Sequence, residues 1–529
     1  MSENSIQEES GLKAVVVVPP VFDFYYTPHR SSGLGAAVVC NLIRTKGLQV
    51  RLLNFPGQAR KVKKRNLPPE LNYLAPYLIA KERGKISFFN HYKRFGPSIG
   101  ECARQILSTS PDLVFISCFA FCYAQSALDL ARQIRKSDLR PMIILGGAGV
   151  SAHPDFFIDN PNVDFAFTGE AEVSLPVFLD IVIAGSPDFS RVPNLYRKNR
   201  GRIIVPERAK FTAPEEIVFV LNKTFETSTA VFFTTTLSRG CPKACRFCSN
   251  FLSHGRDFRT IPPAQIKKGL AAPVTDGIAS HKKVYVNFED DNFLCDPSYF
   301  FSVLDIFKSV FPDVGFLAEN GIDYTLITPE ILEKLIQYGM KQFNLSMVSA
   351  DPELLVHEKR KAGPEKYENI TGILKTHDIP CVTYFICGLK NDTREKVLET
   401  ICYLAGHPTR VGISLFYPVP GIPGFQDKSF FAKISPCLCA GSSAFPWNRS
   451  LTTSEMITAF RLCRFVNLLK SVNRTANDEL MIERSFQEQS LFSLVGTGDD
   501  AALIRVTDMD FEMVDLFFRK ISAPNDVCR

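Results

Sequence analysis

The sequence predicts an α/β protein that contains two parallel sheets in succession and a mostly helical C-terminal region. Short apolar runs of strand length alternate with segments of helical apolar spacing, and this alternation occurs twice, before and after residue 231. Apolar residues make up 45% of the 529 residues and charged residues 22%, which is the composition of a globular protein rather than of a disordered, collagen-like or coiled-coil chain.

The first alternation supplies an open parallel Rossmann-like sheet. The predicted strands are residues 13–19, 49–54, 112–117, 142–145 and 164–168. Helices are predicted at 36–45 and 124–135, and such helices cover both faces of a parallel sheet. We place this domain at 11–184, after a flexible N-terminus at 1–10. A Pro-rich connecting region at 185–230, with a hairpin over 194–205, follows it.

The second alternation, over residues 231–429, predicts a curved or barrel-like parallel sheet built from six β/α units. Its strands are expected at 232–237, 283–288, 314–318, 342–347, 381–387 and 412–417. The helices are expected at 263–271, 299–310, 329–338, 367–377 and 394–405. In such sheets the functional groups gather at the C-terminal ends of the strands. A C-terminal region at 430–529, helical around 454–470, completes the chain, and its sequence indicates no function.

Positive charge is concentrated in an insertion at residues 56–100. This segment holds ten Lys or Arg against two Asp or Glu, whereas the rest of the chain holds 51 basic and 53 acidic residues. It is either a solvated loop, which we favour, or a surface for nucleic acid or polyphosphate.

The cysteines and the hydropathy pattern indicate a cytoplasmic protein. No apolar run reaches the roughly 18 residues that a membrane span needs, and the polar, acidic first ten residues do not resemble a secretion signal. The 15 cysteines are then reduced thiols or metal ligands, and their odd number argues against a fully paired disulfide framework.

Three of these cysteines form a metal-binding pattern directly after the first strand of the second domain. Cys241, Cys245 and Cys248 have the spacing C-x3-C-x2-C, and three thiolates on one tight loop can hold three irons of a [4Fe–4S] cluster. The next cysteine is Cys295, so one iron would keep an open position for a small chelating ligand. Zinc is the alternative, with His254 as the nearby fourth ligand, and we favour the cluster.

With Phe247 before the last cysteine, this loop resembles that of the radical S-adenosylmethionine (SAM) superfamily. Ordered polar strand ends at 289–293, 319–321, 344–349, 384–389 and 417–421 extend the resemblance over about 190 residues. The resemblance implies that residues 231–429 form a partial (β/α)6 radical SAM barrel. It implies that the cluster binds SAM and cleaves it by one-electron reduction to a 5′-deoxyadenosyl radical. It also implies SAM-binding residues, which we expect to be Phe247, Asp290, Asp291, Asn320, Ser346, Ser349 and Gly388.

The first domain resembles the cobalamin-binding domain that precedes the barrel in one large subclass of that superfamily. The resemblance implies a cobalamin site at the strand ends, with Gly33, Gly35, Ser117, Gly146, Gly147, Gly169 and Glu170. Glycines there let the backbone approach a bulky ligand. The chain has no Asp-x-His-x-x-Gly pattern to ligate cobalt. Many relatives carry a His two residues after the Gly-Gly pair. This chain has Gly149 at that position, and its His153 lies further on.

These resemblances imply a cobalamin-dependent radical SAM methyltransferase that acts on an unactivated carbon of a small-molecule or peptide substrate. A reducing donor such as flavodoxin or ferredoxin would supply the electron. One alternative is radical rearrangement, cyclisation or other bond formation with a vestigial cobalamin domain. Another is a nonenzymatic iron–sulfur or zinc protein that binds nucleic acid. We expect neither nucleic acid nor a membrane to be a partner.

Overall fold

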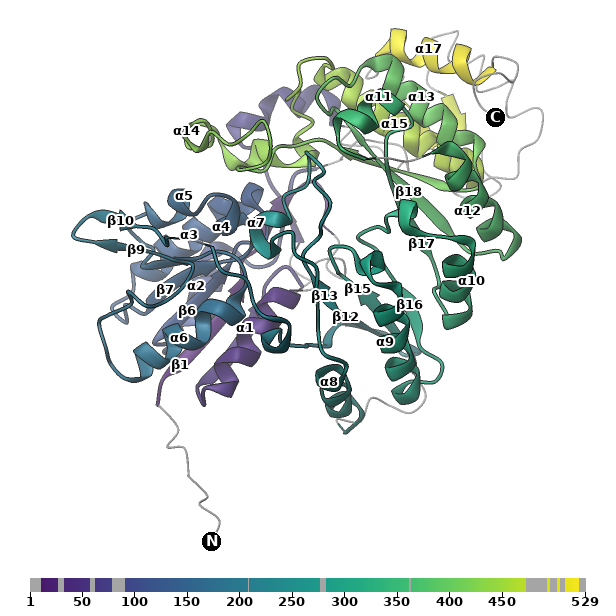
Figure 1. The fold of residues 1–529 in the computed structure, drawn as a ribbon. Coiled ribbons are helices and arrows are strands. Elements are labelled where there is room, and N and C mark those ends of the chain that lie inside the picture. The colour runs from purple at the N-terminus through teal and green to yellow at the C-terminus, as the bar shows by residue number, and fades with distance from the viewer. Residues whose placement is uncertain are drawn as a thin grey trace.

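The fold consists of two α/β domains packed side by side (Figure 1). The computed structural model describes residues 11–26, 33–57, 62–78, 91–207, 209–275, 282–360, 363–471, 492–494, 502–504 and 510–522. The predicted flexible N-terminus at 1–10 lies outside these residues. Within the described part of the chain, no helix is both long enough and apolar enough to cross a membrane.

The first domain is built on a seven-stranded sheet of order β10-β9-β8-β7-β6-β1-β3. The five central and edge strands that pair in parallel are β1 (Lys13–Val18), β3 (Gln49–Asn54), β6 (Leu113–Ser117), β7 (Met142–Gly146) and β8 (Phe165–Phe167). Since β1 is followed by β3 on one side and β6 on the other, the strand order reverses between β1 and β6. Ligands of open α/β sheets bind at such a switch point.

The hairpin predicted for the connecting region forms, but it belongs to this first sheet. Its strands β9 (Leu195–Asn199) and β10 (Arg202–Ile204) are antiparallel to each other, and β9 also pairs with β8. Phe165 and Phe167 of β8 are partly buried, and Leu195 at the start of β9 is buried. The hairpin therefore covers a sheet edge that would otherwise be open.

Helices cover both faces of the first sheet, as predicted for a doubly wound fold. Helices α1 (Leu34–Thr45) and α6 (Ala171–Ile183) bury their apolar sides on one face. Helices α2 (Ile99–Leu107), α3 (Ala124–Arg135) and α5 (Pro154–Ile158) pack on the other face.

The described part of the basic segment is folded rather than a solvated loop. Strands β2 (Val21–Asp23), β5 (Lys93–Phe95) and β4 (Val62–Lys64) form a small antiparallel sheet. The 3-10 helix η3 (Pro69–Tyr77) buries its leucines in the core of the second domain. Residues 58–61 and 79–90, with most of the remaining basic side chains, lie outside the described residues.

Six parallel strands in chain order form the second domain. Strands β12 (Ala230–Thr235), β15 (Lys283–Phe288) and β16 (Gly315–Leu317) make one sheet, with β11 (Asn222–Glu226) antiparallel at its edge. Strands β17 (Phe343–Val348), β18 (Cys381–Cys387) and β19 (Arg410–Leu415) make the other. Two parallel bridges, Phe316 to Met340 and Ile322 to Leu345, connect the two sheets. This confirms the predicted parallel α/β architecture.

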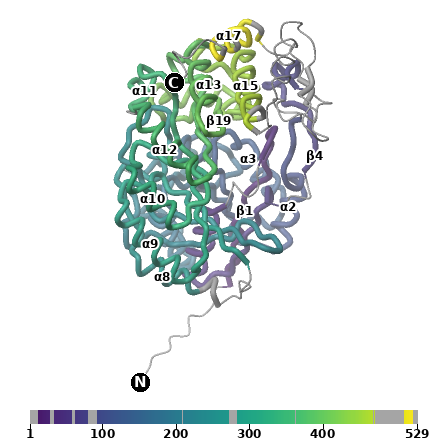
Figure 2. The backbone as a smooth tube through the Cα atoms, turned by 90° about the vertical axis from the view of Figure 1, so that its right-hand side faces the viewer, coloured from purple at the N-terminus to yellow at the C-terminus, as the bar shows by residue number. Residues whose placement is uncertain are grey.

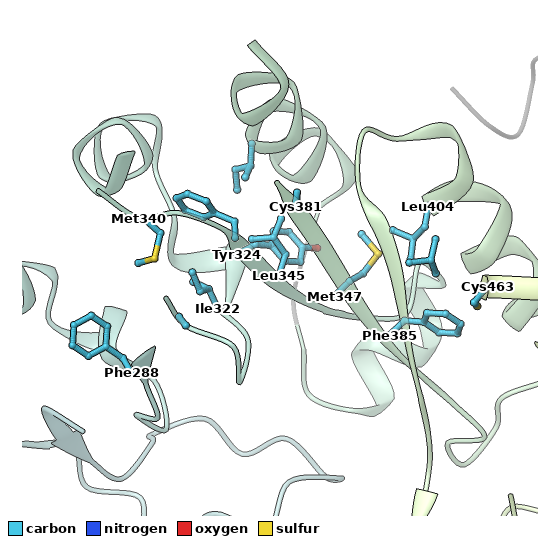
Figure 3. Close-up of a cluster of buried hydrophobic side chains, with 14 of the residues drawn as sticks. Phe288, Ile322, Tyr324, Met340, Leu345, Met347, Cys381, Phe385, Leu404 and Cys463 are labelled. Atoms are coloured by element: carbon cyan, nitrogen blue, oxygen red, sulfur yellow. The ribbon is translucent and has the colours of Figure 1, made fainter. Parts of the chain in front are cut away.

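Helices follow one another along the outer side of these strands (Figures 1 and 2). They are α8 (Pro263–Thr275), α9 (Pro297–Val310), α10 (Pro329–Tyr338), α11 (Pro352–His357), α12 (Pro364–Thr376) and α13 (Arg394–Gly406). Beneath them one apolar core runs across both sheets, from Phe288 through Leu345 to Phe385 (Figure 3). Two C-terminal helices, α15 (Thr453–Ser471) and α17 (Phe511–Ser522), close the far end of this core against β19 and α13.

The remaining described elements are short. They are η4 (Phe121–Tyr123), α4 (Ala148–Ala152), η5 (Pro214–Glu216), β13 (Ser238–Arg239), α7 (Phe251–His254), β14 (Arg259–Thr260), η6 (Phe293–Cys295), η7 (Tyr324–Leu326), α14 (Lys428–Phe431), η8 (Pro436–Cys439), η9 (Gly441–Ser443), β20 (Phe492–Leu494) and β21 (Ala502–Ile504).

Gly149 allows α4 to lie directly on the loop that follows β6, and this contact predicts a stability effect. A Cβ atom there would lie 2.7 Å from the carbonyl carbon of Ala120 and 2.8 Å from Sγ of Cys118. We expect Gly149→Ala to destabilise the protein by about 1–3 kcal/mol through overpacking. Gly372→Ala is the control, because Gly372 is exposed on α12 with no atom within 4 Å of its Cβ position. The control substitution should raise stability by roughly 0.5–1 kcal/mol. Urea unfolding measures the stability of both variants. An unchanged unfolding midpoint for Gly149→Ala would contradict the packing argument.

Candidate functional site

The three cysteines lie on a loop whose two ends are joined by a short antiparallel ladder. Strand β13 precedes the loop and β14 follows it, with Ser238 opposite Thr260 and Arg239 opposite Arg259. Helix α7 lies between the last cysteine and β14. Gly240 has a φ of 82°, and a Cβ atom there would collide with the carbonyl oxygen of Asp257. The entry to the loop therefore requires glycine.

All three thiols line one cleft at the C-terminal ends of the barrel strands. The cleft encloses about 790 Å³, a volume that includes the part open to solvent. Burial raises the pKa of Cys248 to about 11 and also raises the pKa of Cys241. Among the described residues, no three His, Cys, Asp or Glu side chains are grouped as a site for a single metal ion.

Two polar side chains point at the sulfur atoms. Asn292 Nδ2 lies 3.9 Å from Sγ of Cys241, and Arg360 Nη1 lies 3.9 Å from Sγ of Cys245. Donors beside the sulfurs favour the thiolate form that an iron–sulfur cluster requires. The donor set of three thiols with polar neighbours in a partly open cleft fits a [4Fe–4S] cluster.

Asp291 holds both ends of the cysteine loop. Its Oδ2 atom accepts a hydrogen bond from the Gly240 amide at 2.8 Å and lies 2.8 Å from Nδ1 of His254, while Oδ1 accepts from Asn250 Nδ2 at 2.9 Å. Burial alone would raise the pKa of Asp291, but the bonds from His254 and Gly240 and the nearby positive charges outweigh burial and lower it. This carboxylate lines the cleft, and most of its bonding capacity is directed to the loop.

The structure does not bring Asp290 to the cleft. Its carboxylate turns back toward β13, where it accepts from the Leu237 amide at 3.0 Å and from the Ser238 hydroxyl at 2.5 Å. Burial raises the pKa of Asp290 to about 7. Its observed contacts are those of a strand-end cap rather than of a ligand contact.

Among the other residues expected at the SAM site, Phe247, Asn320 and Ser346 line the cleft. Phe247 packs one side against the cluster of Val348, Leu354, Leu355 and Leu389. Ser349 and Gly388 do not reach the cleft. The Ser349 hydroxyl pairs with Thr400 at 3.3 Å, and the Gly388 amide donates to Asp392 at 2.8 Å.

A charged group at the cleft was not among the residues expected from the sequence. Asp323 forms an ion pair with Lys243 and another with Arg360, whose Nη2 lies 3.2 Å from Asp323 Oδ1. Arg360 Nη2 also donates to the Ser346 carbonyl at 2.9 Å. Lys243 stands inside the cysteine motif and could have been noticed. Arg360 follows α11 in a segment with no motif, and only the fold brings it beside Cys245.

In the first domain, the expected glycines lie at the C-terminal edge of the sheet. Gly33 begins α1 with a φ of 67°, and Gly147 follows β7 with a φ of 104°. A Cβ atom on Gly147 would lie 2.7 Å from the Cys118 carbonyl oxygen. Gly35, on the first turn of α1, has no atom within 4 Å of its Cβ position. The remaining expected residues, Ser117, Gly146 and Gly169, end β6, end β7 and follow β8.

This edge is open to a ligand at two positions, because Gly35 and Gly147 leave the backbone exposed there. Glu170 does not face it. That side chain is buried and bonded to Arg259 of β14. His153 is also engaged: it is 3% exposed, its Nε2 lies 3.0 Å from the Lys428 carbonyl oxygen, and its ring stacks on Phe121.

The two candidate sites belong to adjoining parts of the molecule. Helix α4, which follows β7, packs on α7, which follows the cysteine loop (Figure 1). A Cβ atom on Gly169 would lie 3.5 Å from the Ser253 carbonyl oxygen, and one on Gly421 would contact both Leu252 and the Ala152 carbonyl. The C-terminal edge of the first sheet is therefore next to the cysteine loop.

Comparison with known sequences agrees with this geometry. Residues 235–404 match the Radical SAM superfamily. The chain is 25% identical over 216 residues to bacteriochlorophyllide d C-12(1)-methyltransferase of Chlorobaculum tepidum, covering 40% of this chain and 46% of that protein. It is 21% identical over 315 residues to an uncharacterized methyltransferase of Pyrococcus horikoshii, covering 58% of this chain and 66% of that one. The chain thus spans less than two thirds of either relative.

Solved structures show the same fold. The methyltransferase TsrM from Kitasatospora setae, solved with cobalamin and a [4Fe–4S] cluster, aligns with a TM-score of 0.57 at 14% identity, over 78% of this chain and 74% of TsrM. The cobalamin-dependent enzyme OxsB, solved with aqua-cobalamin and SAM, aligns with a TM-score of 0.53 at 13% identity, over 80% of this chain and 55% of OxsB. Residues 235–404 are therefore a radical SAM domain, and the chain shares its overall fold with TsrM and OxsB.

Proposed function

We propose that this protein is a cobalamin-dependent radical SAM methyltransferase that methylates an unactivated carbon of a small-molecule or peptide substrate. One observation carries the proposal: a cleft with three thiols and a sheet edge with exposed glycines adjoin each other in one chain. The alignment with TsrM over 78% of the chain covers more than the radical SAM domain, and the curated relatives are named methyltransferases.

Cys241, Cys245 and Cys248 would hold the [4Fe–4S] cluster, and SAM would take the open iron position in the same cleft. The chemistry that these groups supply is reductive SAM cleavage to a hydrogen-abstracting radical, with cobalamin as the methyl carrier. Cys245 is buried, so the protein shields one side of the cluster from water. We place the protein in the cytoplasm, where an electron donor such as flavodoxin or ferredoxin would reduce the cluster.

The charges and surfaces of the cleft suit SAM. Lys243 and Arg360 share one carboxylate, Asp323, so the group keeps one net positive charge for the SAM carboxylate. Phe247 offers an apolar surface for adenine. Asn320 and Ser346 offer hydrogen-bonding groups for the ribose or the amino acid part.

The cluster assignment predicts a selective effect of cysteine substitution. Anaerobic reconstitution should load about four irons per chain, since three thiolates and one exogenous ligand complete the cluster. Cys241→Ala, Cys245→Ala and Cys248→Ala should each lose the visible absorbance and SAM cleavage. Cys295→Ala is the control, because that thiol is near Cys241 yet does not line the cleft. A full cluster in the triple variant would contradict the assignment.

The contacts of Asp291 predict that it affects the cluster more than it affects SAM. Asp291→Asn removes the charge that faces His254, and losing such a bond costs about 1.5–3 kcal/mol. We expect less iron to be retained through gel filtration, whereas the control Asp305→Asn, on the outer helix α9, should retain iron normally. Full iron content with weaker SAM binding would instead show that Asp291 binds the SAM ammonium. Asp290→Asn should leave SAM affinity unchanged and lower thermal stability.

The glycine-lined sheet edge predicts cobalamin binding without a protein nitrogen below the cobalt. Under reducing, anaerobic conditions the protein should retain hydroxocobalamin through gel filtration. Electron paramagnetic resonance of the Co(II) form should show no nitrogen splitting, because the His153 ring is buried and already bonded. A split spectrum that disappears in His153→Ala would refute that detail. Failure to retain cobalamin would favour the alternative of radical rearrangement or cyclisation with a vestigial first domain.

A further inference from the structure

A buried group of four charged residues joins the first domain to the base of the cysteine loop. Two members are Glu170, the N-cap residue of α6, and Glu172, in the first turn of that helix. The other two are Arg239 and Arg259, which face each other in the β13–β14 ladder. We call this group the interdomain clamp. The Glu side chains are at most 2% exposed and the Arg side chains at most 11% exposed.

Arg259 is the centre of the clamp. Its Nη1 and Nη2 atoms each lie 2.9 Å from one oxygen of Glu170, which is the bidentate geometry of a strong Arg–carboxylate pair. The same guanidinium donates to the carbonyls of Thr212 at 2.6 Å and His254 at 2.5 Å. Arg259 thus connects the first domain, the connecting region and the helix that follows the cysteines.

Arg239 makes the second connection, two residues before Cys241. Its Nη2 lies 3.5 Å from Glu172, and its Nη1 lies 3.9 Å from Glu170. The Glu170 oxygen that faces Nη1 of Arg259 also accepts from the Thr212 amide at 2.7 Å. Burial acting alone would raise the pKa of Glu170, but these partners lower it, so the carboxylate stays ionised in the folded protein.

The clamp continues into the contacts that shape the loop itself. Arg259 fixes the backbone of His254, the His254 ring pairs with Asp291, and Asp291 accepts from the amide of Gly240, next to Cys241. A chain of buried contacts therefore runs from the strand end of the first sheet to the cysteine loop.

We infer that the interdomain clamp positions the cysteine loop relative to the first sheet, with Glu170 and Arg259 as its main positioning residues. The inference rests on the proposed function, in which two cofactors on different domains have to meet at a fixed spacing. A displacement of about 1 Å can cost roughly a hundredfold in rate, so a rigid connection between the two sites is needed.

The test uses the full chain, reconstituted with iron and sulfide and loaded with hydroxocobalamin. In Glu170→Gln we expect iron and cobalamin contents close to wild type. Amides of the segment 238–260 should exchange hydrogen roughly tenfold faster or more, because charge-assisted bonds that hold the loop are lost. Power saturation of the Co(II) resonance, with the cluster reduced, should show weaker relaxation by the cluster. The control Glu226→Gln breaks the partly exposed ion pairs of Glu226 with Lys223 and Lys282, and it should behave as wild type in both measurements.

A second variant covers the case in which Glu170→Gln fails to fold. Arg259→Lys keeps the charge but cannot reach Glu170, Thr212 and His254 together, so it should give the same faster exchange. Unchanged exchange and unchanged saturation in either folded variant would overturn the inference. If wild type binds no cobalamin, the proposed function fails, whereas hydrogen exchange in the cluster-loaded chain still tests the clamp.

Discussion

The cysteine loop has to hold three thiols in place although it has little regular structure of its own. Within it, the Cys248 amide donates to the Cys245 carbonyl at 3.3 Å, whereas the Arg246 amide donates at 3.4 Å to the carbonyl of Glu358, which follows α11 outside the loop. Most of the remaining support comes from outside the loop, with Asp291 at its ends and the β13–β14 ladder at its base. The positions of the thiols depend on these external contacts.

Buried charge provides much of that support, and its physical chemistry explains why it is paired. An ion removed from water is costly unless its partners replace the lost solvation. Glu170 has a bidentate partner in Arg259, and Asp323 has two cations. Breaking one side of such a pair leaves an uncompensated charge, so these groups constrain geometry more strongly than an apolar contact would.

The two domains adjoin each other at the C-terminal ends of their parallel strands. Parallel strands bring their C-terminal ends to one edge, and both sheets present that edge to the segments that join them. The packing of α4 on α7, with Gly169 beside Ser253 and Gly421 beside Leu252, brings the two edges into direct contact. An apolar core that spans both sheets of the second domain makes the barrel side of this junction a single unit (Figure 3).

The secondary-structure elements and the cysteine motif could be predicted from local sequence patterns. Apolar periodicity located the strands. It also located the outer helices, although the helices expected at 299–310 and 367–377 begin earlier in the structure, at Pro297 and Pro364, where the missing amide of Pro is not needed. The cysteine spacing and Phe247 pointed to the cleft because those residues are neighbours in the chain. These signals are local, so they could be read without knowing the fold.

Only the tertiary structure decided which distant side chains meet. Arg360 reaches Cys245 from 115 residues away, and Arg259 reaches Glu170 from 89 residues away. Asp290 and Asp291 are adjacent and chemically identical, yet one caps a strand end while the other lines the cleft, because successive side chains at a strand end point in different directions. Glu170 follows Gly169 after strand β8, and this position led to the prediction of a cobalamin contact. In the folded protein Arg259 of the second domain lies beside Glu170, and the two form an ion pair. No local pattern encodes such pairings, since they depend on how the two sheets pack.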